Sequence, residues 1–118
     1  MQNENDAPLI YKIVSRQQWD AAVKEGVFAG AAIDLQDGYI HFSTAEQAAE
    51  TAAKHFSQQP DLLLVAVETA SLGGELKWEP SRGGALFPHL YASLDPNSVC
   101  SVVELPVGED GLHVFPSF

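Results

Sequence analysis

The pattern of apolar and polar positions predicts a β–α unit at the start of the folded chain. Residues 9–14, LIYKIV, are rich in β-branched and aromatic side chains, which favours a strand. Residues 16–25 follow with apolar side chains at helical spacing. Ser15 provides an N-cap and Gly26 a C-terminal stop, so this helix has predicted limits at both ends.

The next segment predicts a short strand and a second main helix. Residues 39–42, YIHF, are typical of a strand. Residues 44–56 are rich in Ala and have high helix propensity, and Ser43 with Glu46 predicts a capping box at their start. The stretch before this strand, residues 27–38, is predicted to be a connector that ends in an Asp-Gly turn.

The second half of the chain predicts strands joined by turns. Residues 61–69 form a nearly continuous apolar run, which indicates a strand covered on both faces. Shorter strands are expected at 75–79, 98–105 and 112–115, and the Gly- and Pro-broken stretch 78–94 is expected to be mostly an irregular loop. This order of elements predicts an α+β domain with two main helices and a mixed or mostly antiparallel sheet.

Length and composition indicate one compact domain. The chain has 118 residues, of which 46% are hydrophobic and 19% charged, a globular composition. We expect a single domain over residues 9–118, preceded by a disordered lead at 1–8. No apolar run approaches the ~20 residues needed to cross a membrane. The polar N-terminal residues do not resemble a signal peptide, so a cytoplasmic location is expected.

The charge balance restricts the expected partners. The formal net charge is −10, from 16 acidic and 6 basic side chains. Because affinity for a phosphate backbone comes mainly from Lys and Arg, nucleic-acid binding by a broad basic face is not expected. A small anionic ligand is still compatible with this charge, since one Arg and a few backbone N–H groups can hold it. The four His residues lack the spacing of metal ligands, and no metal is expected.

The first candidate group of functional residues lies in DGYIHFSTAEQ. Alternation along a strand places Tyr39 and His41 on one face, while Ile40 and Phe42 share the other face and pack the core. Ser43 then lies at the N-terminus of the second helix, where free N–H groups favour an anion or a polar ligand atom. The alternative interpretation is that Ser43 only caps the helix and His41 bonds a backbone carbonyl; the sequence leaves both open.

The second candidate group lies in WEPSRGGALFPHLYASL. Arg82 offers a bidentate bond to a carboxylate or phosphate, and Trp78 offers an aromatic wall. His89 and Tyr91 are two positions apart, so they share a face if this segment is a strand. The alternative interpretation is a local ion pair between Arg82 and Glu79 that only pins the loop.

Three phrases together carry a specific family resemblance: YKIVSRQQWDAA, DGYIHFSTAEQ and LKWEPSRGGALFPHLYASL. They resemble the small bacterial and plant proteins of the domain-of-unknown-function 952 family, over about residues 9–107. That family is in turn distantly similar to the ADP-ribosyltransferase fold, so the resemblance implies a compact fold of this kind.

The distant similarity implies roles for four residues in binding NAD. His41 matches the strand histidine that holds the ribose and the nicotinamide amide, and Ser43 matches the hydroxyl that follows it. Tyr91 is the candidate for the aromatic side chain that stacks on nicotinamide. Glu104 is the candidate carboxylate that orients the ribose and stabilises developing oxocarbenium charge.

These observations give one leading hypothesis and two others. The leading hypothesis is a small-ligand pocket for NAD, ADP-ribose or another phosphorylated ligand, with transfer or cleavage at the nicotinamide–ribose bond if the protein is an enzyme. The pocket would be lined by His41, Ser43, Trp78, Arg82, His89 and Tyr91. The alternative is a non-enzymatic module that binds a protein partner through its acidic surface and its C-terminal HVFPSF tail. The third hypothesis is general acid–base chemistry by His41 and His89.

Overall fold

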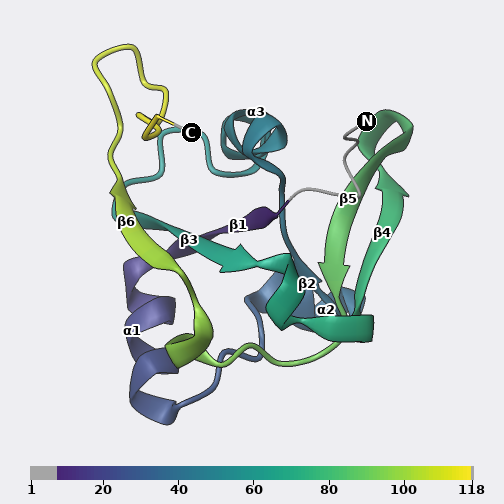
Figure 1. Cartoon of the computed structure of the whole chain (residues 1–118). Helices are drawn as coiled ribbons and strands as arrows, with labels where there is room; N and C mark the ends of the chain where they lie inside the picture. Colours follow the sequence, from purple (N-terminus) through teal and green to yellow (C-terminus); the bar gives the residue numbers. More distant parts are fainter. Residues whose placement is uncertain (1–7, 118) are drawn as a thin grey trace.

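Two antiparallel sheets of three strands each form the framework of the protein (Figure 1). The computed structural model describes residues 8–117, apart from the side chain of Arg82. The first sheet has the strand order β1–β3–β6 and the second the order β2–β5–β4. The strands are β1 (Leu9–Ser15), β2 (Ile40–His41), β3 (Leu62–Glu68), β4 (Leu76–Ser81), β5 (Ala85–Leu90) and β6 (Ser101–Leu105). The predicted α+β class is confirmed; the predicted lead at 1–8 lies outside the described residues except for Pro8.

Helix α1 (Arg16–Glu25) begins and ends where the sequence predicts. The Ser15 hydroxyl accepts a hydrogen bond from the backbone N–H of Gln18 at 3.1 Å. Gly26 adopts the left-handed conformation with φ 83° and closes the last turn. Both signals act within one helical turn of the chain, which explains why the sequence alone is sufficient here.

Helix α2 (Ala32–Asp37) replaces part of the connector predicted for residues 27–38. The carboxylate of Asp34 accepts a hydrogen bond from the Ala31 backbone N–H at 2.8 Å, which satisfies one free donor at the helix start. Gly38, with φ 89°, ends the helix in the left-handed conformation. The prediction of a simple connector was therefore wrong.

Helix α3 (Ala45–His55) begins one residue later than predicted. Its N-cap is Thr44, whose hydroxyl accepts from the backbone N–H of Gln47 while the Gln47 side chain accepts from the Thr44 N–H. Ser43 does not cap this helix, because its backbone is paired with Tyr11 in an isolated bridge between the two sheets. The Ser43 hydroxyl instead lies 2.9 Å from the hydroxyl of Thr51, two turns further along α3.

The stretch 78–94 forms most of a regular hairpin rather than an irregular loop. Strands β4 and β5 pair from Leu76 with Leu90 to Ser81 with Ala85. Gly83 and Gly84 take positive φ angles of 77° and 92° in the connection, a conformation that side chains with a Cβ rarely adopt. The Gly pair therefore marks the hairpin turn, and the prediction of an irregular loop was wrong.

The hydrophobic core has two parts, one on each face of the first sheet. Helix α3 covers one face, and α1 lies on the other (Figure 1). Strand β3 is buried over six consecutive residues, which confirms the strand covered on both faces. The part under α3 contains Tyr11, Ile13, Ala52, Leu62, Leu64, Ala66 and Leu105. The other part contains Ile10, Val14, Trp19, Ala22, Phe28, Ile40, Phe42, Leu63, Val65, Val67, Leu90 and Leu94.

The C-terminal segment folds back on the domain without the strand predicted at 112–115. Its pairing is a single bridge between Val107 and His113. Phe115 packs against the core under α3, and a ring nitrogen of His113 bonds the carbonyl of Gln59 at 2.8 Å. No helix among the described residues is long and apolar enough to span a membrane.

Candidate functional site

A cavity of about 440 Å³ lies where β1, α2, α3 and the second sheet meet. The volume is within the range of about 300–1,000 Å³ usual for small-molecule sites. Apolar and aromatic walls with a few polar groups are also typical of such sites. The cavity is lined by Tyr11, Lys12, Ile13, Ile33, Asp37, His41, Phe42, Ser43, Thr51, His55, Phe56, Ser81, Phe87 and His89.

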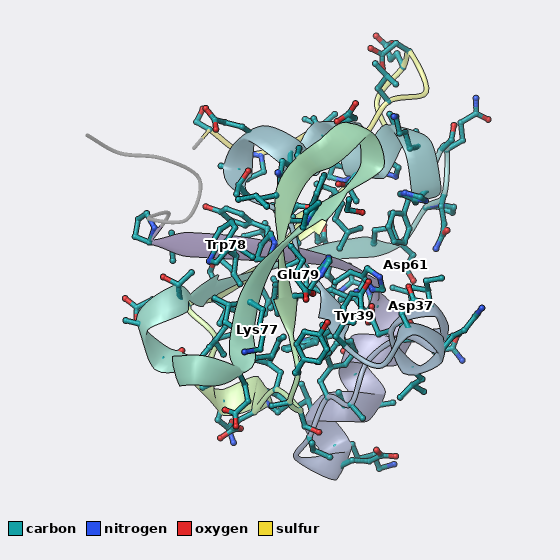
Figure 2. The ribbon with its side chains drawn as sticks, turned by 90° about the vertical axis from the view of Figure 1, so that its right-hand side faces the viewer. Asp37, Tyr39, Asp61, Lys77, Trp78 and Glu79 are labelled. Carbon is teal, nitrogen blue, oxygen red and sulfur yellow. The ribbon has the colours of Figure 1, made fainter. Side chains whose placement is uncertain are left out.

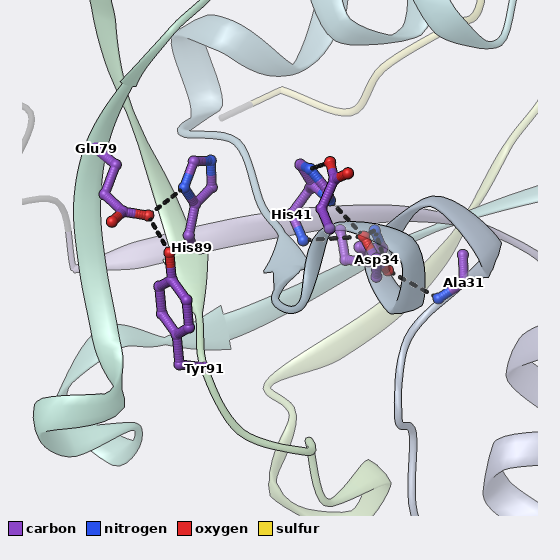
Figure 3. Close-up of polar contacts among 8 residues, drawn as sticks. Ala31, Asp34, His41, Glu79, His89 and Tyr91 are labelled. Atoms are coloured by element: carbon purple, nitrogen blue, oxygen red, sulfur yellow. Dashed lines mark hydrogen bonds and ion pairs between the residues drawn. The ribbon is translucent and has the colours of Figure 1, made fainter.

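His41 is held by a carboxylate on each side of its ring. Its Nδ1 lies 2.6 Å from Oδ1 of Asp34, and its Nε2 lies 2.9 Å from Oδ2 of Asp37 (Figure 3). Carboxylates accept hydrogen bonds and do not donate them, so the two contacts are both hydrogen bonds in the imidazolium form. The inner partner, Asp34, is buried, whereas the Asp37 side chain is 35% exposed at the cavity. The outer contact is therefore the one that a ligand can reach.

Asp34 is the buried centre of this network. In addition to His41, it accepts hydrogen bonds from Lys12 Nζ at 3.0 Å and from the backbone of Ala31. Burial alone would raise the pKa of Asp34, but the His41 hydrogen bond and the Lys12 charge lower it to about 2. Burial lowers the pKa of Lys12, and the Asp34 carboxylate opposes that shift. The pair therefore keeps a carboxylate ionised in the interior, fixed beside His41.

His89 and Tyr91 share one carboxylate across the β4–β5 hairpin (Figure 3). His89 Nδ1 lies 2.7 Å from Oε1 of Glu79, and the Tyr91 hydroxyl donates to the same oxygen at 2.7 Å. The hydrogen bonds from His89 and Tyr91 lower the pKa of Glu79. The hydrogen bond to Glu79 raises the pKa of Tyr91 to about 12, with burial adding to the shift. His89 and Tyr91 lie on the same side of the hairpin, as their spacing predicts for a strand, although Tyr91 is one residue beyond the end of β5.

Tyr39 packs between the rings of the two groups. Its ring stacks on His89 with centroids 4.1 Å apart, and it contacts His41 at 4.6 Å and Tyr91 at 5.1 Å. The ring centroids of His41 and His89 are 5.5 Å apart. These contacts hold both imidazoles in place, so the polar groups are arranged before any ligand arrives.

The structure brings together part of the predicted site. His41, Ser43 and His89 line the same cavity. Tyr91 is not on the wall of this cavity: it is joined to His89 through Glu79, is 42% exposed and lines a neighbouring hollow with Tyr39. The side chain of Arg82 lies outside the described residues, so its predicted anion contact stays a prediction.

Two predicted residues lie elsewhere. Trp78 is not on the cavity wall; it is on the other side of β4 from Glu79 and packs against the core cluster beside α1 (Figure 2). Glu104 lies on β6, the outer strand of the first sheet, where its carboxylate binds Arg16 at 2.8 Å. Strand β6 is separated by β3 from β1, the strand of this sheet that lines the cavity. Glu104 is therefore not on the cavity wall with His41.

The structure also adds four charged residues that the sequence analysis did not place in the site: Lys12, Asp34, Asp37 and Glu79. Lys12 carried a usable signal, because it is the one charged residue in the otherwise apolar strand LIYKIV. A lysine on a buried strand requires a charged partner. Its partner is 22 residues away in the chain, and nothing local identifies it. No group of three or more His, Cys, Asp or Glu among residues 8–117 is arranged to hold a metal ion.

The fold and the site define a small α+β protein with two carboxylate-bound histidines at one cavity. The chain belongs to the family described as protein of unknown function (DUF952), whose sequence model matches residues 13–102. The chain is similar to protein CC0527 from Caulobacter crescentus, with 55% sequence identity. The crystal structure of CC0527 matches with a TM-score of 0.86, over 90% of this chain and 93% of that chain. The solution NMR structure of CC0527 is 56% identical, with a TM-score of 0.81, over 88% and 90% of the two chains. A comparison with curated proteins gives no match.

Proposed function

We propose that the cavity binds a small phosphorylated ligand, with NAD and ADP-ribose as the first candidates. The observation that carries this proposal is the convergence of His41, Ser43 and His89 on one cavity. His41 on β2 and Ser43 just after it are close in the chain, whereas His89 comes from β5 and is the cross-strand partner of His41. The resemblance to ADP-ribosyltransferases implies the ribose-binding histidine at His41 and the hydroxyl at Ser43.

The anionic part of the ligand is proposed to bind beside His41. Asp37 is a partly exposed carboxylate on Nε2 of this ring, so a ligand phosphate can take its place without disturbing the buried Asp34. Lys12 also lines the cavity, but its charge is paired with Asp34, so the imidazolium of His41 is the cationic group proposed to meet the ligand. The proposed anion contact therefore depends on His41 itself and not on a positive field of the whole protein, whose net charge is −10.

If the protein is an enzyme, the proposed reaction is cleavage or transfer at the nicotinamide–ribose bond. The carboxylate proposed to assist His89 is then Glu79 rather than Glu104, because Glu79 is bonded directly to His89, whereas Asp34 and Asp37 are bonded to His41. The exposed ring of Tyr91 is the surface on which nicotinamide would stack. The alternative hypothesis, a protein-binding module that uses the acidic surface and the C-terminal tail, stays a prediction.

The test is a titration of the ¹⁵N-labelled protein with NAD, ADP-ribose, nicotinamide and sulfate. We expect shift changes centred on His41, Ser43 and His89. In calorimetry, His41→Ala should weaken ADP-ribose binding by about 10- to 100-fold, the range of one charged hydrogen bond. His113→Ala is the matched control, because His113 bonds a backbone carbonyl outside the cavity. No response at millimolar ligand overturns the proposal.

A further inference from the structure

His89 is a buried histidine with one ring nitrogen unused. Its side chain is 4% exposed and lines the cavity. Nδ1 is bonded to Glu79, whereas Nε2 has no hydrogen-bond partner among the described residues. Buried polar atoms in folded proteins nearly always have a partner, so an open one at a cavity wall indicates a position for a ligand atom or water.

Glu79 determines whether Nε2 of His89 is a hydrogen-bond donor or acceptor. A carboxylate only accepts, so Nδ1 of His89 carries the hydrogen of their bond. In the neutral ring, Nε2 is then a lone-pair acceptor. The Tyr91 hydroxyl bonds the same oxygen of Glu79, and the ring of Tyr39 stacks on His89 at 4.1 Å. The carboxylate and the imidazole are thus both held from two directions, and Nε2 has a fixed orientation.

The two cavity histidines therefore differ in chemistry. His41 has carboxylates on both nitrogens and no free lone pair in its bonded form. His89 has one carboxylate and one open nitrogen. His41, as an imidazolium, is suited to bind an anionic group of the ligand. His89 is suited to accept a proton, because a base needs an accessible lone pair and a partner that stabilises the imidazolium formed.

We infer that His89 is the general base of the cavity and that Glu79 is its positioning residue. The group that binds Nε2 is a hydroxyl, either water or an alcohol on the acceptor. The inference rests on the proposed function for the rest of the ligand. The O–H proton moves to Nε2, and the oxygen attacks the ribose C1′ of NAD. The bond from C1′ to the nicotinamide nitrogen breaks, its electron pair leaves with nicotinamide, and the proton on His89 later passes to solvent.

The first test is the tautomer of His89, read from long-range ¹H–¹⁵N correlation spectra of the free protein. We expect a protonated Nδ1 and an unprotonated Nε2. Glu79→Gln replaces one carboxylate oxygen by an amide N–H₂, which can donate to Nδ1, so we expect the hydrogen to move to Nε2 in this variant. Glu109→Gln, an exposed change in the C-terminal segment, is the control and should leave the spectrum of His89 unchanged. A hydrogen on Nε2 of the wild-type protein overturns the inference.

The second test measures nicotinamide release from NAD together with ADP-ribose affinity. His89→Asn keeps an N–H near the Nδ1 position for Glu79 and removes Nε2. We expect a loss of rate of about 10²–10⁴-fold, the usual contribution of a general base, with ADP-ribose affinity within about threefold of wild type. Glu79→Gln should lower the rate without changing the affinity, and His113→Asn should change neither.

The outcomes separate the two proposals. Equal rates for wild type and His89→Asn, with ADP-ribose still bound, overturn only the role of His89. A wild-type protein that neither binds ADP-ribose nor releases nicotinamide overturns the proposed function and the inference that depends on it. Loss of rate in His89→Asn with retained affinity and the predicted tautomer supports both.

Discussion

Lys12 and Asp34 form a buried ion pair in which Nζ lies 2.8 Å from Oδ2, and the side chains are 6% and 0% exposed. The pair connects the first sheet to α2. It also determines the position of His41, whose Nδ1 bonds the other oxygen of Asp34. The arrangement of the cavity therefore depends on a charge pair in the interior, where the loss of one partner leaves the other without compensation.

We expect Asp34→Asn to lower the free energy of unfolding by about 3–5 kcal/mol, the usual cost of breaking a buried ion pair. The variant leaves the Lys12 charge buried and weakens the bond to His41. Urea denaturation followed by circular dichroism measures the change. Glu50→Gln is the control, because Glu50 pairs with Lys54 on the exposed face of α3 and should cost less than about 1 kcal/mol. Equal effects of the two substitutions would contradict the structural role of Asp34.

The pKa of Asp34 also predicts a loss of stability in acid. It is lowered from 3.8 to about 2 in the folded protein, so the ionised carboxylate stabilises the fold above pH 4. This stabilisation disappears as the pH falls from about 4 to about 2, and it amounts to on the order of 2 kcal/mol. Urea denaturation at a series of pH values measures it. The slope between pH 4 and pH 2 should be smaller in Asp34→Asn, and an unchanged slope would assign the acid sensitivity to other carboxylates.

The position of Glu104 predicts that this residue takes no part in ligand binding or in the reaction, in contrast to the catalytic role expected from the sequence. Its side chain is 75% exposed and bonds Arg16, which also bonds Asp61. Glu104→Gln should therefore change the free energy of unfolding by less than about 1 kcal/mol and leave ADP-ribose affinity and nicotinamide release unchanged. Denaturation, calorimetry and the nicotinamide assay test this. A slower release of nicotinamide by a stably folded Glu104→Gln protein would contradict this prediction and support a catalytic role for Glu104.

The elements that the sequence predicts well depend on local signals. The limits of α1 follow from Ser15 and Gly26, which act on neighbouring residues. Helix α2 has only six residues, and the side chain at its start, Asp34, is held by tertiary partners. The β4–β5 hairpin was missed because its Pro and Gly residues indicate an irregular segment, although Gly83 and Gly84 are what the turn requires.

In the site, too, local patterns were predicted and tertiary contacts were not. Alternation along a strand placed Tyr39 and His41 on one face, and the structure has their rings 4.6 Å apart. The bond from Lys12 to Asp34 spans 22 residues and that from Arg16 to Glu104 spans 88. Spacing in the sequence carries no information about such partners, because they are fixed only when the sheets assemble. The carboxylates on the histidines are nearer in the chain, since Asp37 is four residues from His41 and Glu79 is ten residues from His89. They were not predicted because residues 27–38 and 78–94 were expected to be a connector and an irregular loop, not the helix and hairpin that bring these side chains together.

The hydrogen bond from Tyr91 to Glu79 predicts an unusually weak phenol acid. It raises the pKa of Tyr91 to about 12 from an ordinary value of 10.0, with burial as the second cause. NMR of the ¹³Cζ signals should show Tyr91 still protonated at pH 11. In Glu79→Gln the charge of the acceptor is removed, so the pKa should fall towards 10 and the signal should begin to move below pH 11. Tyr91→Phe identifies the signal, and Glu109→Gln is the control. A Tyr91 signal that titrates alike in wild type and Glu79→Gln would show that Glu79 does not hold this hydroxyl, and would remove one of the two contacts that fix the carboxylate beside His89.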